Sequence, residues 1–151
     1  MNRLFPRHLR ASLALGLLAA CTGAAQASPY VMFRDPGCGC CMEWAAHIRE
    51  KLGAEVTVRE DVPMGVVKAT RGVPAELASC HTMEVEGYVI EGHVPAEAIA
   101  RLLTERPNGV RGLAVAGMPL GSPGMEAGGR VQPYKVIAFG SGGTRVWAAY
   151  P

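Results

Sequence analysis

The chain has 151 residues, of which 49% are hydrophobic and 19% are charged, and its formal net charge is +2. This length is enough for one domain with its own core, but not for two. No apolar run approaches the roughly 20 residues that a membrane-spanning helix needs. The small net charge also gives no reason to expect a nucleic-acid partner.

Residues 1–27 have the features of a secretory signal peptide. A basic start precedes an apolar run over 13–20, and Ala-Gln-Ala at 25–27 offers a cleavage site. The residues before Cys21 resemble a lipoprotein signal, which makes a lipid anchor on Cys21 the alternative to release. The remaining 28–151 then form one exported domain, and without the three arginines of the signal it has 12 basic and 13 acidic residues.

Alternating strands and helices follow in the mature chain. Short apolar runs bounded by turn residues predict strands, and apolar residues at helical spacing predict helices. A segment with seven glycines over 108–130 is expected to be a long functional or disordered loop. We expect strands over 30–33, 55–59, 82–85 and 88–91, helices over 41–52, 63–70 and 95–105, and a closing hairpin over 134–139 and 144–149.

Three cysteines lie within four positions, in the sequence D-P-G-C-G-C-C-M-E-W at 35–44. Cys38 and Cys41 form a C-x-x-C pair between a strand and a helix, which is typical of a redox pair. Cys40 lies inside this pair, where it would compete in disulfide exchange. Thiolates are also soft ligands, so the crowded turn favours a Cu(I) or Zn(II) site. Both interpretations stay open, with metal binding favoured over redox chemistry alone and over purely structural disulfides.

The position of the C-x-x-C pair predicts an α/β protein with a thioredoxin-like fold. We expect a central mixed sheet flanked by helices, with the hairpin at the C-terminal end. Such folds place a cis-proline opposite the active thiols, and Pro74 in Gly72-Val73-Pro74 is the candidate.

Other residues could complete a metal site. Cys80 is the expected fourth thiolate, although a lone cysteine is also a common small core residue. His81, His93 and His47 are further ligand or supporting candidates, each of which also fits an ordinary loop or helix position. The thioethers of Met118 and Met125 would favour copper over zinc if they reach the site, and would otherwise be core filler.

Four motifs together closely resemble the CopG-type family of periplasmic copper-resistance proteins, formerly a domain of unknown function. They are D-P-G-C-G-C-C-M-E-W-A-A-H at 35–47, S-C-H-T at 79–82, E-G-H-V-P at 91–95 and G-M-P-L-G-S-P-G-M-E at 117–126. The resemblance covers essentially the whole mature chain. It implies a thioredoxin-like copper protein encoded near copper efflux systems, with its copper site on Cys38, Cys40, Cys41 and Cys80.

The leading hypothesis is therefore a copper-resistance protein that holds Cu(I) on this cysteine cluster and interconverts Cu(I) and Cu(II). Its expected partners are copper ions and other copper-resistance or efflux proteins. The alternative is a thiol-disulfide oxidoreductase that uses Cys38 and Cys41, with Cys80 as the resolving thiol. A structural zinc module is the third hypothesis.

Overall fold

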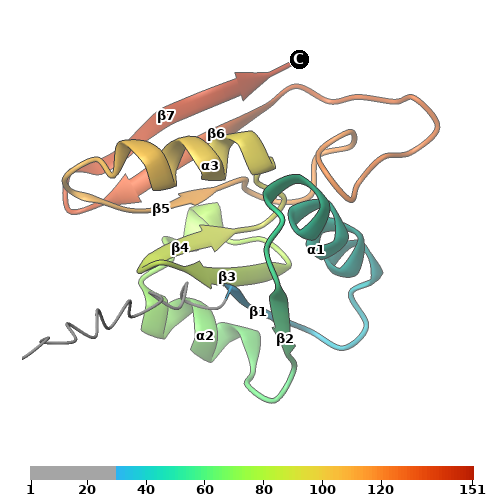
Figure 1. Ribbon diagram of the computed structural model, residues 1–151, viewed down its shortest axis with the longest axis horizontal. Coiled ribbons are helices and arrows are strands. Elements are labelled where there is room, and N and C mark those ends of the chain that lie inside the picture. The colour runs from blue at the N-terminus through green and yellow to red at the C-terminus, as the bar shows by residue number, and fades with distance from the viewer. Residues whose placement is uncertain (1–29) are drawn as a thin grey trace, which may run out of the picture.

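The computed structural model describes residues 30–151, so the expected signal peptide and Cys21 lie outside the described residues. Residues 30–151 form one sheet of seven strands in the order β2-β1-β3-β4-β5-β6-β7, with the β6–β7 hairpin at one edge (Figure 1). The strands are β1 (Tyr30–Arg34), β2 (Val56–Arg59), β3 (His81–Val85), β4 (Tyr88–Glu91), β5 (Val110–Ala114), β6 (Tyr134–Gly140) and β7 (Gly143–Tyr150). The helices are α1 (Gly39–Leu52), α2 (Met64–Arg71) and α3 (Ala96–Glu105), with a 3-10 turn η1 (Ala75–Leu77).

The sheet is mixed. Strand β1 pairs parallel with β2, and β4 pairs parallel with β5, whereas the other neighbouring strands are antiparallel. The α/β class, the mixed sheet flanked by helices and the C-terminal hairpin are therefore confirmed. The narrower thioredoxin-like assignment stays a prediction.

Alternation along the strands separates two packed faces. In β1, Met32 packs in the main core with Trp44 and Ile48 of α1 and with Leu102 of α3. Its neighbour Phe33 points to the other face and packs with α2. Successive strand residues point to opposite faces, so α1 and α3 cover one face of the sheet and α2 covers the other.

Strand β5 corrects the expectation of an unbroken loop over 108–130. Gly112 lies in this strand where a Cβ atom would stand only 1.9 Å from the carbonyl oxygen of Val89. A strand glycine often marks such a close backbone approach. The glycine therefore belongs to a buried strand, and the loop that follows covers only 115–133.

The prediction of a cis peptide before Pro74 is wrong, because residues 30–151 contain no cis peptide bond. Pro74 precedes η1 in extended conformation. It lines a cavity of about 380 Å³ together with Arg111 and Phe139, and Phe139 packs with Leu77 of η1 in a cluster separate from the main core. Pro74 therefore lies beside the residues that pack around η1.

Within the described part of the chain, none of the helices is both long and apolar enough to cross a membrane.

Candidate metal and thiol site

The first turn of α1 carries the cysteine motif. Cys38 is the N-cap residue, and its backbone N–H donates to the carbonyl of Asp35 at 3.0 Å. The guanidinium of Arg34 donates to the carbonyl of Cys38 at 2.8 Å, which holds the turn from the end of β1. The helix begins at Gly39, two residues earlier than expected, so Cys40 and Cys41 lie in its first turn. Free N–H groups and the partial positive charge of a helix N-terminus favour thiolates there.

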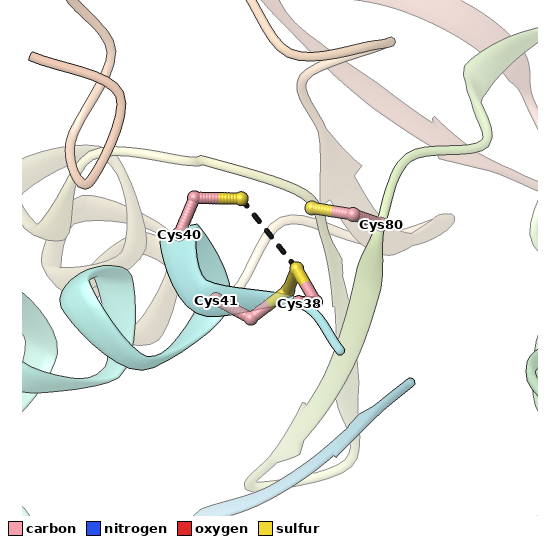
Figure 2. A group of neighbouring side chains, drawn as sticks. All are labelled: Cys38, Cys40, Cys41 and Cys80. Atoms are coloured by element: carbon pink, nitrogen blue, oxygen red, sulfur yellow. Dashed lines mark hydrogen bonds between the residues drawn. A yellow bond between two sulfur atoms is a disulfide. The ribbon is translucent and has the colours of Figure 1, made fainter. Parts of the chain in front are cut away.

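The four expected sulfur ligands meet at this helix end, within 4.8 Å of one another. Cys38 and Cys41 form a disulfide with 5.5 Å between their Cα atoms, while Cys40 and Cys80 are free thiols. Figure 2 shows Cys40 and Cys80 pointing toward each other, and the Sγ atoms of Cys40 and Cys38 are 3.5 Å apart. Consecutive helix residues are rotated by about 100°, which lets Cys41 point into the core while Cys40 faces Cys80.

Two histidines extend the site from Cys80. The Cys80 Sγ atom lies 3.1 Å from Nε2 of His93 and 3.5 Å from Nδ1 of His81. Both imidazoles are fully buried. The ring of His81 packs on Trp44 with 4.3 Å between ring centroids and edge-on to His93 at 5.1 Å. Cys80, His81 and His93 thus form a second group of potential ligands that shares Cys80 with the sulfur group.

Burial keeps this group uncharged when no metal is bound. Desolvation, with a smaller effect of neighbouring Cys40, raises the pKa of the Cys80 thiol to about 11. Burial also lowers the pKa of His81 well below its usual value, helped by His93 and Lys68. The pKa of His93 is likewise lowered, chiefly by burial. Two neutral imidazoles therefore face a protonated thiol near neutral pH.

A buried carboxylate supports the Cys80 segment from the other side. Glu91 in β4 is fully buried and forms an ion pair with Lys68 of α2. Its two oxygens accept hydrogen bonds from the backbone N–H of Ser79 at 2.6 Å and from the hydroxyl of Thr82 at 2.6 Å. Glu91 and Lys68 were not predicted as supporting residues from the sequence, although a glutamate that ends an apolar strand is a signal for a buried partner.

Three other predicted residues lie outside these two groups. Nε2 of His47 accepts a hydrogen bond from the backbone N–H of Ala96 at 3.4 Å, at the start of α3. Met118 is 53% exposed. Met125 is half-buried in a turn closed by its carbonyl and the N–H of Gly121 at 3.0 Å. Neither methionine belongs to the main core cluster, against which Cys38, Cys40 and Cys80 pack.

The donor set fits a soft metal ion. It offers sulfur and imidazole nitrogen, the ligands that suit Cu(I) and also Zn(II). Nε2 of His81 is buried and has no hydrogen-bond partner within residues 30–151. An unpaired buried nitrogen is costly, and coordination or a hydrogen bond to a bound ligand would satisfy it.

The fold and this site define the class of protein: it is an α/β protein with a buried centre of thiols and imidazoles at the start of α1, which packs on a mixed sheet. Comparison with known proteins makes the class specific. Residues 77–125 match the family described as a protein of unknown function, DUF411. None of the curated proteins compared with the chain matches it.

Two solved structures of a copper resistance protein, CopG, are similar to the chain. Form 2 is 42% identical, with a TM-score of 0.75, and the match covers 82% of this chain and 100% of that chain. Form 1 is 41% identical, with a TM-score of 0.76, and the match covers 83% of this chain and 99% of that chain. The chain therefore belongs to the CopG family of copper resistance proteins. Together with the cysteine cluster, this supports a copper-related role.

Proposed function

We propose that this protein binds Cu(I) in the periplasm on Cys38, Cys40, Cys41 and Cys80. The observation that carries the proposal is the convergence of four sulfur atoms within 4.8 Å of one another. Reduction of the Cys38–Cys41 disulfide would make all four sulfurs available to hold copper, and each thiol would lose its proton on binding. His93 and His81 add nitrogen ligands beside Cys80.

The same cysteines would interconvert Cu(I) and Cu(II). When the Cys38 and Cys41 thiols form their disulfide, they release two electrons and two protons. Those two electrons would reduce two Cu(II) ions to two Cu(I) ions, and in the reverse step two Cu(I) ions would return two electrons to the disulfide, which takes up two protons. Reducing equivalents from a thiol donor would restore the dithiol. The signal peptide would direct export of the chain, and residues 28–151 would form the single mature domain. Copper-resistance or efflux proteins would then supply copper to this domain and accept copper from it.

Copper binding is tested on protein purified from a periplasmic fraction. The reduced protein is loaded with Cu(I) without oxygen, and copper per chain is compared with that of the Cys38→Ser and Cys80→Ser variants. We expect Cu(I) per chain to fall in Cys38→Ser, which loses one ligand of the sulfur group, and to fall further in Cys80→Ser, because both ligand groups share Cys80. His47→Asn is the control, because His47 lies outside both ligand groups, and it should bind copper normally. Equal copper content in all proteins, or retained zinc with copper excluded, would contradict the proposal.

A thiol-disulfide oxidoreductase is the second candidate, favoured by the Cys38–Cys41 disulfide itself. Cys40 lies 3.5 Å from Cys38, sulfur to sulfur, so a free thiol is already placed beside a disulfide sulfur. This candidate requires turnover of a disulfide substrate in copper-free protein, with loss of turnover in Cys38→Ser. If the protein turns over a disulfide substrate only when copper is bound, this second candidate is excluded.

A further inference from the structure

The turn over 119–125 packs directly against the helix that carries the cysteines. Hydrogen bonds from the N–H of Met125 to the carbonyl of Ser122 at 2.8 Å and from the hydroxyl of Ser122 to the carbonyl of Pro119 at 2.7 Å close it. A bond from the N–H of Gln132 to the carbonyl of Leu120 at 2.9 Å anchors it to the chain beyond. Although rich in glycine and proline, this turn is held in one place.

Gly124 is the contact point between this turn and α1. A Cβ atom at Gly124 would lie 2.7 Å from the backbone nitrogen of Trp44 and 2.8 Å from the carbonyl oxygen of Cys40. Both are backbone atoms of a helix and cannot rotate away as a side chain would. Gly124 also has φ +79°, a conformation that side chains disfavour. Only glycine lets the turn approach the cysteine helix this closely.

The preceding residue contacts the ligand group. The carbonyl of Pro123 lies 2.8 Å from Nδ1 of His93. A carbonyl oxygen can only accept, so Nδ1 carries the proton. A neutral imidazole carries one proton, so with that proton on Nδ1 its lone pair is on Nε2, which faces the Cys80 sulfur at 3.1 Å.

We propose that Gly124 is a positioning residue that fixes the tautomer of His93. By seating the turn on α1, it holds the Pro123 carbonyl against Nδ1 and so keeps the Nε2 lone pair directed at Cys80. The consequence for copper rests on the proposed function: Nε2 is then ready to bind an ion at Cys80 without a tautomer change. A partner that orients a metal-binding histidine through its other nitrogen commonly changes metal affinity by about 10- to 100-fold.

The tautomer is measured directly in metal-free protein by long-range ¹H–¹⁵N NMR of the histidine side chains. The wild type should show His93 with the proton on Nδ1, and Gly124→Ala should show a population with the proton on Nε2. Gly128→Ala is the matched control, because Gly128 also has a positive φ, +57°, but a Cβ there meets nothing within 4 Å. It should leave the His93 signals unchanged. Pro123→Ala, which keeps the carbonyl, should do the same.

Three outcomes would overturn the proposal: a wild-type His93 protonated on Nε2, an unchanged tautomer in folded Gly124→Ala, or an equal change in Gly128→Ala. The wild-type measurement can overturn the proposal even if Gly124→Ala does not fold, because it needs no variant. Cu(I) affinity is measured separately and should fall about 10- to 100-fold in Gly124→Ala. If the wild type binds no copper, the proposed function fails while the tautomer result still decides the role of Gly124.

Discussion

The buried ion pair of Glu91 and Lys68 should contribute measurably to the unfolding free energy. Glu91→Gln removes a carboxylate that is fully buried and that faces a Lys68 side chain only 16% exposed. Removing one partner of a buried ion pair costs about 3–5 kcal/mol. The glutamine oxygen can still accept the Ser79 N–H bond, and the partly exposed ammonium of Lys68 retains some water. We therefore expect a loss near the lower limit, about 3 kcal/mol of unfolding free energy.

Urea denaturation at pH 7, with the disulfide intact, measures this loss. Glu105→Gln is the matched control, because Glu105 pairs with Arg101 at the surface, with side-chain exposures of 48% and 46%. That change should cost at most about 0.5 kcal/mol. The double variant Lys68→Met with Glu91→Gln should recover part of the loss, because it leaves no unpaired buried charge. A Glu91→Gln loss equal to that of Glu105→Gln would refute the reasoning.

Two further predictions follow from protonation. The lowered pKa of His81 means that the unfolded chain binds a proton below about pH 6.5 that the folded chain does not. Unfolding free energy should therefore fall as pH falls from 7 to 5, by up to about 1.4 kcal/mol per pH unit for this histidine. Unfolding free energies from urea titrations at several pH values should change less steeply with pH in His81→Gln than in the wild type. The same pH dependence in both proteins would contradict a lowered pKa for His81. Separately, alkylation of Cys80 in metal-free protein, followed by mass spectrometry, should still accelerate above pH 9 because its pKa is about 11. A plateau below pH 9 would exclude a buried, protonated thiol.

Local patterns were enough to predict most of the elements. The helix that follows the cysteines, the Glu86-Gly87 hairpin turn and the closing hairpin all depend on neighbouring residues, and all are present. Strand β5 was missed because Gly112 looks like a loop residue until the carbonyl of Val89 in a neighbouring strand is known. Local sequence does not contain that neighbour.

The site shows the same division. The four cysteines could be grouped from motif spacing and family resemblance, because thiol clusters are rare unless they have a chemical role. The Pro123 carbonyl at His93 and the Glu91 bond to Ser79 could not be predicted. Each joins residues that are distant in the chain through a backbone group, and a backbone group leaves no mark in the sequence.

Cys80 belongs to both groups of potential metal ligands. The sulfur group includes Cys38 and Cys41, so forming their disulfide removes two of its four ligands. The second group, Cys80 with His81 and His93, contains neither of them and keeps all three donors in both redox states. Under the proposed function, oxidation of the dithiol would therefore reduce the copper capacity of the sulfur cluster and leave a mixed sulfur and nitrogen site. Such a site can hold copper in either oxidation state, because imidazole suits Cu(II) and a thiolate suits Cu(I).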